Sequence, residues 1–235
     1  SDVYKRQQRM KWHKLLGFDD NSYQFHDHLK LAHYANAACD IEFKFPFGFK
    51  ELEGIHSRTD FDLSSHQEFA KKKLQYFDPE ENQNYVPYVV ETSVGADRLF
   101  LLTLCNAYTE EVIGEGEQQK ERTYLKLHPA VAPIKAAIFP VTKKDGLPEK
   151  ARLIFDELRL DMKVIYEEKD NIGKRYARQD LIGTPFCIAV DYQSLEDDTV
   201  TIRYRDSTLQ ERIAIKDLKA KLMAETSFNT ILSKL

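Results

Sequence analysis

A group of ionisable side chains lies in one short stretch that is rich in apolar residues. It consists of Glu51, Glu53, Arg58, Asp60 and Asp62, interleaved with Phe, Leu and Ile. Charged groups in an apolar run usually pair with one another or hold a ligand. Side chains alternate along a strand, so Glu51 and Glu53 are predicted to share one face. A salt bridge between Glu53 and Arg58 is the structural alternative.

A second polar segment follows about thirty residues later and reads as a strand, a glycine turn and a helix. Gly95 lets the backbone come close to a ligand, and Arg98 lies in the predicted first helical turn. A planar guanidinium can grip phosphate oxygens with two hydrogen bonds. Taken alone, G-x-x-R is a weak motif, and pairing of Arg98 with Asp97 or Glu91 at the helix end is then favoured.

The strand before this turn carries a carboxylate and a hydroxyl at alternate positions, Glu91 and Ser93. These two side chains are predicted to share a face, and together they form a natural receptor for a small ammonium group. For Arg58, Asp60 and Asp62 two interpretations stay equally open: support of a substrate site, or a structural ion-pair network.

The segment ELEGIHSRTDFDL, followed by VVETSVGADR, resembles the active-site strands of class II aminoacyl-tRNA synthetases. It is most similar to the glycyl-tRNA synthetases of the homodimeric type. The resemblance implies activation of glycine by ATP with Mg²⁺, transfer of glycine to tRNA(Gly), and a homodimer in the full-length protein. Two catalytic residues are implied, Glu51 and Arg98, with Arg98 on the γ-phosphate of ATP and Glu51 linked to Mg²⁺.

The same resemblance implies two sets of binding residues. ATP would be bound by Glu51, Leu52, Gly95, Ala96, Asp97 and Arg98. The glycine pocket would be formed by Glu91, Thr92, Ser93, Val94 and Gly95. Glu91 would hold the α-ammonium group, and Thr92 stands where the family commonly has proline, which changes strand stiffness more than chemistry.

The bulk composition is that of a soluble globular protein of one or two domains. The chain has 235 residues, a net charge of −4, 42% hydrophobic and 31% charged residues. This charge argues against a protein that coats nucleic acid non-specifically, but it allows a local basic patch. Three widely spaced cysteines indicate buried thiols in a reducing compartment. No eighteen-residue apolar run and no signal peptide are seen, so we expect a cytoplasmic protein without a membrane span.

An α+β domain is expected to position these polar segments. It is predicted over residues 1–128, and the resemblance implies that it is part of the class II catalytic domain, an antiparallel sheet with helices. Helices are expected at 4–16, 29–38, from 62 onward, and at 96–108, the last of these buried. Strands are expected at 40–45, 49–57, 74–77, 85–93 and 123–127, with a surface loop at 109–122.

Residues 129–235 alternate between strand and helix and predict an α/β domain with a mixed sheet of about five strands. IGKRYARQDLIGTPFCIAVD resembles the anticodon-binding domain shared by the glycyl, threonyl, prolyl and histidyl enzymes. Phosphate contacts to tRNA are predicted from Lys174, Arg175, Arg178, Arg203 and Arg205. From composition alone, a solvated helix face has about equal weight.

Two family features are absent from the sequence: the helix and strand that build the dimer, and the motif whose arginine binds the α-phosphate. We therefore expect the C-terminal part of a longer enzyme, largely inactive by itself. The alternatives are a threonine, proline or histidine enzyme, and a tRNA-binding paralogue without catalysis. His26, His28 and His33 fit no strong zinc pattern, and polar surface histidines are favoured.

Overall fold

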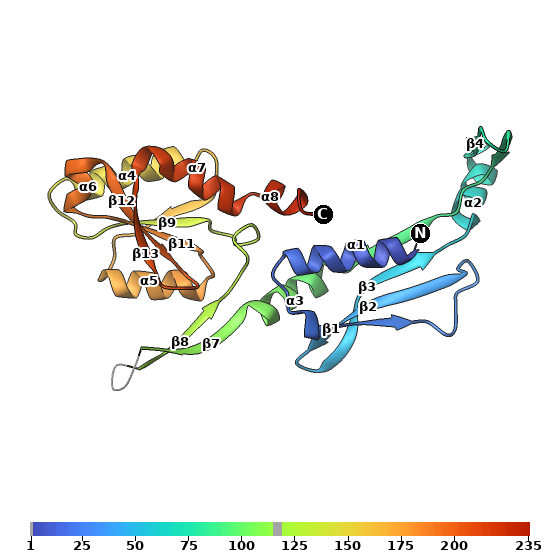
Figure 1. The fold of residues 1–235 in the computed structure, drawn as a ribbon, viewed down its shortest axis with the longest axis horizontal. Helices are drawn as coiled ribbons and strands as arrows, with labels where there is room; N and C mark the ends of the chain where they lie inside the picture. The colour runs from blue at the N-terminus through green and yellow to red at the C-terminus, as the bar shows by residue number, and fades with distance from the viewer. Residues whose placement is uncertain (1, 115–118) are drawn as a thin grey trace. The chain divides into compact units, whose positions relative to one another are not determined.

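The computed structural model describes residues 2–114 and 119–235. The chain folds into two compact units, Ser1–Cys105 and Asn106–Leu235 (Figure 1). This division precedes the boundary predicted at residue 128. The reason is the hairpin of β7 (Tyr108–Ile113) and β8 (Lys120–Leu125), whose Arg122 is ion-paired within the second unit. The predicted loop at 109–122 is therefore wrong for the described residues; 115–118 lie outside them.

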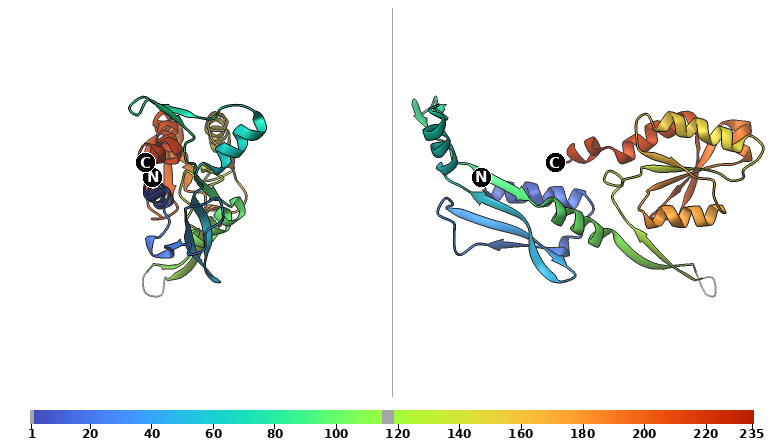
Figure 2. Two further views of the ribbon diagram at one scale, coloured as in Figure 1. Left: turned by 90° about the vertical axis from the view of Figure 1, so that its right-hand side faces the viewer. Right: turned by 180° about the vertical axis from the view of Figure 1, so that it is seen from behind.

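The first unit is built on a four-stranded antiparallel sheet (Figures 1 and 2). Its strands, in spatial order, are β1 (Tyr23–Asp27), β2 (Ala37–Phe45), β3 (Gly48–Ser57) and β6 (Val90–Val94). Helix α1 (Asp2–Leu15) packs on one face of this sheet and contacts β3. Apolar side chains on that face are buried beneath the helix, among them Ile41 and Ile55. A short 3₁₀ turn (Asp20–Ser22) joins α1 to the sheet.

Two helix predictions in this unit differ from the structure. The predicted helix at 29–38 is wrong, because Ala37 and Ala38 are the first residues of β2 and pair with β3. Cross-strand pairing overrides the helix propensity of alanine here. Helix α3 (Ala96–Ala107) is present as predicted but is not buried in this chain: Phe100 is 65% exposed.

An excursion between β3 and β6 forms the rest of the first unit. It contains α2 (Phe61–Ala70) and the small hairpin of β4 (Tyr76–Asp78) and β5 (Gln83–Tyr85). The helix predicted from residue 62 onward is confirmed. Helix α2 buries none of its residues, so ion pairs at its first turn matter for its position.

The second unit contains the predicted mixed sheet of five strands, in the order β10-β9-β11-β12-β13. The three parallel strands are β10 (Val164–Tyr166), β9 (Ala136–Pro140) and β11 (Phe186–Val190). The antiparallel strands are β12 (Thr199–Tyr204) and β13 (Gln210–Ala214). The α/β alternation predicted for this part of the chain is confirmed.

Helices cover both faces of this sheet, as Figure 1 shows. They are α4 (Leu147–Leu158), α5 (Ile172–Leu181), α6 (Tyr192–Asp197), α7 (Ile215–Thr226) and α8 (Phe228–Leu232). The larger core joins the sheet to α4 and α7, and a smaller one packs Phe139 and Cys187 against α5. In the described residues, no helix combines the length and apolar character needed to cross a bilayer.

Candidate functional site

A β-bulge in β3 decides which way the polar side chains of this strand point. Residues directly opposite each other in neighbouring strands share a face. Asp40 of β2 is opposite Gly54 of β3, and Glu42, two residues later, is opposite Glu51. Ile41 is opposite Glu53, so Leu52 has no partner in β2 and is the extra residue of a bulge. Glu51 therefore lies on the same face as Gly54.

The neighbouring strand adds its polar side chains to that face. His56 of β3 is opposite Glu91, and Gly54 is opposite Ser93. We call this surface the polar face; it is formed by Asp40, Glu42, Glu51, His56, Glu91 and Ser93. The bulge thus puts Glu51 on the same face as Glu91 and Ser93, from which regular alternation would have separated it. The prediction that Glu51 and Glu53 share a face is wrong for the same reason.

Glu53 lies on the opposite face, beneath α1, and is 1% exposed. Its carboxylate accepts hydrogen bonds from Arg9 and from Nε2 of His13, the latter at 3.1 Å. Burial raises the pKa of Glu53, but the bonds from His13 and Arg9 outweigh burial and hold it below its usual range. Glu53 is therefore a structural anchor for α1, and the alternative of a bridge to Arg58 is wrong.

Arg98 projects from the first turn of α3 and contacts Glu51 (α3 and β3 in Figure 1). Its Nη1 donates to the Glu51 carbonyl oxygen at 2.7 Å and lies 3.2 Å from Oε2 of the Glu51 carboxylate. Both side chains are about half exposed, at 52% and 53%. The partner of Arg98 is thus Glu51, and not the neighbouring Asp97 or Glu91. A guanidinium and a carboxylate are held side by side at the surface, each open to a ligand.

The segment predicted to form the glycine pocket divides between the two faces of the sheet. Glu91 and Ser93 lie on the polar face, whereas Thr92 is opposite Ile55 and Val94 is opposite Glu53. Side chains of Thr92 and Val94 therefore point away from Glu91 and Ser93. Of the strand residues in the predicted pocket, the structure brings these two together with Glu51.

Gly95 directly precedes α3, and its φ is not one of the positive values that favour glycine. A Cβ at this position would meet Arg98 at an ordinary 3.8 Å. Close approach of a ligand remains the prediction for this glycine. Ala96 and Asp97 are exposed at the start of α3.

The histidines of the first unit have identified partners. His28 Nε2 is 2.8 Å from a carboxylate oxygen of Asp40, and His26 Nδ1 is 3.4 Å from Glu42. His33 lies against the rings of Tyr34 and Phe61. Within 2–114 and 119–235, no three His, Cys, Asp or Glu residues are grouped so as to hold a metal ion.

Three of the cations predicted to contact tRNA are buried in the second unit. Arg175, Arg203 and Arg205 are 2%, 8% and 2% exposed. Arg175 donates to the carbonyl oxygens of Pro140 and Asp170 at 2.7 and 3.0 Å. A guanidinium held by interior acceptors cannot reach a phosphate without breaking those bonds, so these three assignments are corrected to structural roles.

Arg205 shows what such a structural role can be. Its guanidinium donates to the carbonyl oxygens of Gly183 and Leu127, at 2.6 and 2.7 Å, and to the carboxylate of Asp206. These bonds join the end of β12 to the segment that follows β8. Arg205 therefore fixes the entry of the chain into the α/β sheet.

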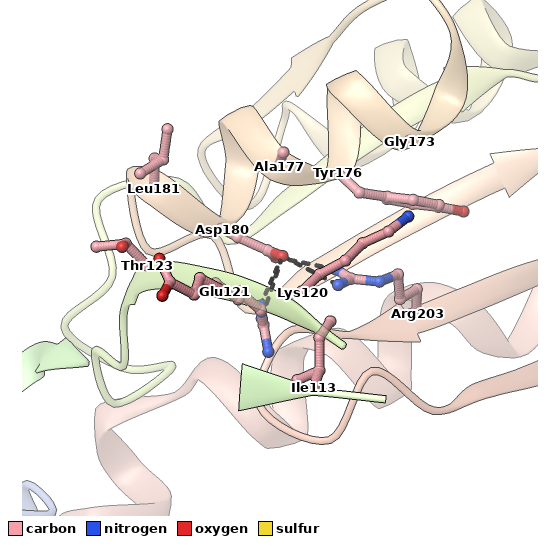
Figure 3. Close-up of a pocket in the computed structure, with 11 residues that line it drawn as sticks. Ile113, Lys120, Glu121, Thr123, Gly173, Tyr176, Ala177, Asp180, Leu181 and Arg203 are labelled. Carbon is pink, nitrogen blue, oxygen red and sulfur yellow. Dashed lines mark hydrogen bonds and ion pairs between the residues drawn. The ribbon is translucent and has the colours of Figure 1, made fainter. Parts of the chain in front are cut away.

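Arg203 belongs to a buried ion-pair network below a cavity of about 480 Å³ (Figure 3). Both oxygens of the Asp180 carboxylate accept from Arg203, at 2.9 and 3.0 Å. Oδ2 also accepts from Arg122 of β8. Figure 3 shows the Asp180 carboxylate pointing toward Arg203, with Tyr176 above them. The network joins the β7–β8 hairpin to α5 and β12.

Exposed cations gather instead where the parallel strands end. Lys143 and Lys144 follow β9, Lys169 follows β10, and Lys174 lies in the first turn of α5; all four are exposed. The sequence prediction missed the first three. The signal that could have found them is their place in loops after parallel strands, because such loops share one edge of the sheet. Arg178 is ion-paired with Glu167 and Asp170.

Comparison with known proteins places these two units in context. Residues 135–225 match the family model described as an anticodon binding domain. The chain is 50% identical over 223 residues to a glycine–tRNA ligase of Chlorobaculum tepidum, covering 93% of this chain and 47% of the relative. It is 47% identical over 226 residues to the ligase of Treponema denticola, covering 94% of this chain and 50% of the relative.

A similar match is found with the glycine–tRNA ligase of Bacillus cereus, at 48% identity over 228 residues, 96% of this chain and 48% of the relative. The chain spans about half the length of the curated relatives it matches. The matched half contains both the antiparallel sheet with its polar face and the α/β unit. Over nearly all of its length, this chain is a homologue of the glycine–tRNA ligases, which are aminoacyl-tRNA synthetases.

Proposed function

We propose that this chain is the C-terminal part of a glycine–tRNA ligase. The complete protein would activate glycine with ATP and Mg²⁺ and transfer it to tRNA(Gly), as a homodimer in the cytoplasm. The observation that carries the proposal is the polar face, where a β-bulge brings Glu51 into line with Glu91 and Ser93. Sequence similarity alone would not require these three residues to share one face of the sheet.

Glu51 and Arg98 have the chemistry that a bound nucleotide and its metal ion require. The Glu51 carboxylate is an oxygen ligand of the type that Mg²⁺ prefers, and it is half exposed. Arg98 can exchange its bond to that carboxylate for bonds to a phosphate oxygen, since both groups are accessible. Bound Mg-ATP supplies the phosphorus atom that the glycine carboxylate attacks. Arg98 would neutralise charge on the phosphate chain, and Glu51 would hold the metal ion.

Glu91 and Ser93 would bind the amino acid. The Glu91 carboxylate provides a counter-charge for the α-ammonium group, and the Ser93 hydroxyl can accept a further hydrogen bond. Gly54, opposite Ser93, contributes no side chain to the surface between them. A Cβ on Gly54 would come within 3.1 Å of Nε2 of His56, so the imidazole already borders this position. Such a shallow, bordered site suits an amino acid without a side chain.

The second unit would bind tRNA through the edge where its parallel strands end. Ligands of open α/β sheets bind at this edge, and Lys143, Lys144, Lys169 and Lys174 supply exposed positive charge there. In this proposal residues 129–235 are the anticodon-binding domain. Arg178 would contribute only by leaving its partners Glu167 and Asp170.

Glycine-dependent exchange of pyrophosphate into ATP tests the proposal. The assay is run on this chain and on a version extended upstream to the length of the relatives. Exchange by the extended version is expected, and Arg98→Ala should reduce it about a hundredfold or more, the usual cost of removing a group that stabilises transition-state charge. Exchange with threonine, proline or histidine instead of glycine would refute the assigned substrate. Binding of tRNA with no exchange at all would identify a non-catalytic paralogue.

A further inference from the structure

The cavity of about 480 Å³ in the second unit lies between the β7–β8 hairpin and α5 (Figure 3). Its volume is within the range of about 300–1,000 Å³ that is typical of small-molecule sites. None of the residues that line it belongs to the glycine, ATP or tRNA sites proposed above. The chemistry of its walls therefore has to be explained separately.

Apolar side chains line the cavity and stay open to solvent. Ile113, the last residue of β7, is 36% exposed, and Leu181, the last residue of α5, is 53% exposed. Ala177 lies four residues before Leu181 and therefore on the same face of the helix. A ligand with an apolar body would remove these side chains from water, and the hydrophobic effect would favour its binding.

The ring of Tyr176 adds an aromatic surface whose position is fixed in advance. Its centroid is 5.6 Å from that of Phe139, and the guanidinium carbon of Arg203 lies 4.8 Å from it. Burial raises the pKa of the Tyr176 hydroxyl to about 12, so this group is protonated at neutral pH. Among the described residues it has no hydrogen-bond partner, and it can therefore donate to a ligand.

The charged side chains that face the cavity leave one positive charge unbalanced. Arg122 and Arg203 are already paired with carboxylates in the network described above. Lys120 is exposed, and in the part of the chain that the structure describes its ammonium group has no carboxylate partner. The side chain of Glu121 points to the other face of β8, because neighbouring residues of a strand alternate. The cavity thus favours a ligand with a single negative charge.

We propose that this cavity binds a small aromatic monocarboxylate. Its ring would lie against Tyr176 and cover Ala177 and Leu181. Its carboxylate would be held by Lys120, with the Tyr176 hydroxyl as a second donor. A ligand bound in this way would bridge the hairpin and α5. The inference goes beyond the proposed function and does not rest on it, because none of these residues takes part in the ligase reaction.

Titration calorimetry of the full chain with cinnamate tests the proposal, with cinnamamide as the neutral ligand of the same shape. Cinnamate is expected to bind with a dissociation constant on the order of 1 mM, as suits a ligand of this size. Cinnamamide should bind about fivefold more weakly, because it lacks the pairing with an exposed ammonium group. Equal affinities for the two ligands would refute the assignment of an anion, and no binding of either would refute the site.

A variant that fills the cavity shows where the ligand binds. Ala177→Phe should abolish the binding of both ligands, because its ring would occupy the space beside Tyr176. Ala220→Phe is the matched control, since it adds the same ring to an exposed position of another helix, α7, and should leave both affinities unchanged. Cinnamate binding that persists in Ala177→Phe would refute the location.

A second variant tests the charge without changing the packing of the unit. Lys120→Gln should weaken cinnamate binding about fivefold and leave cinnamamide binding unchanged. Lys163→Gln removes the same charge from another exposed position of the second unit and should change neither affinity. Equal effects of the two substitutions would refute the role of Lys120. This variant decides the question even if Ala177→Phe alters the urea midpoint.

Discussion

Substitution of the buried Asp180 by asparagine should destabilise the second unit more than the loss of a surface charge does. The carboxylate of Asp180 is 5% exposed and accepts from Arg203 and Arg122, whose side chains are 9% and 8% exposed. Asparagine has the same shape, but its amide nitrogen is a donor and would face one of the two guanidinium groups. Arg203 would then lack a counter-charge, and Arg122 would lose one of its two carboxylate partners.

The expected magnitude follows from this geometry. Removing one partner of a buried ion pair costs about 3–5 kcal/mol, because the remaining charge stays desolvated. Arg122 keeps a second partner, Glu111, at 2.7 Å, and that carboxylate is 33% exposed. This residual pairing favours the lower end of the range. A loss of about 3 kcal/mol corresponds to about two powers of ten in the unfolding equilibrium.

Amide hydrogen exchange of the full chain measures this loss of stability within the second unit itself. Amides of the central strand β11 (Phe186–Val190) should exchange about a hundredfold faster in Asp180→Asn, when exchange requires global opening of the unit. Asp156→Asn is the control: its pair with Arg159 spans 2.9 Å, but both side chains are more than half exposed. Surface pairs contribute about 1 kcal/mol or less. Equal exchange rates in the two variants would refute the reasoning.

Two further predictions concern backbone strain and pH. Gly183 has φ +80°, and a Cβ there would lie 2.6 Å from Cδ1 of Leu127, whereas Gly146 has φ +81° with nothing within 4 Å. Urea unfolding should therefore show a loss of about 3 kcal/mol for Gly183→Ala and about 1 kcal/mol for Gly146→Ala; equal losses would contradict this. A hydrogen bond from Arg212, opposed by burial, lowers the pKa of Asp191 to about 2. The stabilisation of the fold by ionised Asp191 should be complete above its unfolded pKa of about 3.9 and lost as pH falls toward 2. The difference in urea midpoint between the native chain and Asp191→Asn should therefore vanish as pH approaches 2. A difference that stays constant with pH would refute this prediction.

The α/β unit was the more predictable half of the chain, for a physical reason. Its buried parallel strands are short apolar runs, such as Phe186–Val190, separated by helices with clear caps. Asn171, for example, caps α5 by accepting from the backbone of Lys174. Pattern and local propensity agree there. In the first unit the alanines at 37 and 38 favour a helix locally, and only pairing with β3 decides otherwise.

The site residues were predictable by type but not by direction. Strand periodicity assigned Glu51 and Glu53 to one face, and a bulge at Leu52 reversed one of them. No local signal in the sequence announces this bulge, because it depends on the register with β2. The chemistry of Arg98 could be read from its place after Gly95, but its partner Glu51 could be found only in three dimensions.

The sequence-based prediction for the buried arginines was wrong for a different reason. In α5, Arg175 follows Ile172 by three residues and precedes Gln179 by four, so all three lie on one helix face. That face packs on the sheet, and Arg175 and Gln179 are buried there. Helical spacing could have indicated this position, but arginine is so often exposed that composition outweighed it. Arg203 lies in β12 and Arg205 directly follows it, and the partners that bury them come from distant segments.

The bulge at Leu52 ties the direction of Glu51 to the pairing register of β3 with β2. A regular ladder over the same residues would place Leu52 opposite Glu42 and turn Glu51 toward α1, away from Glu91 and Ser93. Deletion of Leu52 would instead give a regular ladder in which Glu51 stays opposite Glu42, because only the extra residue is lost. Variants of this strand should therefore be judged by the register that they impose on Glu51, which residue count and side-chain identity do not report separately.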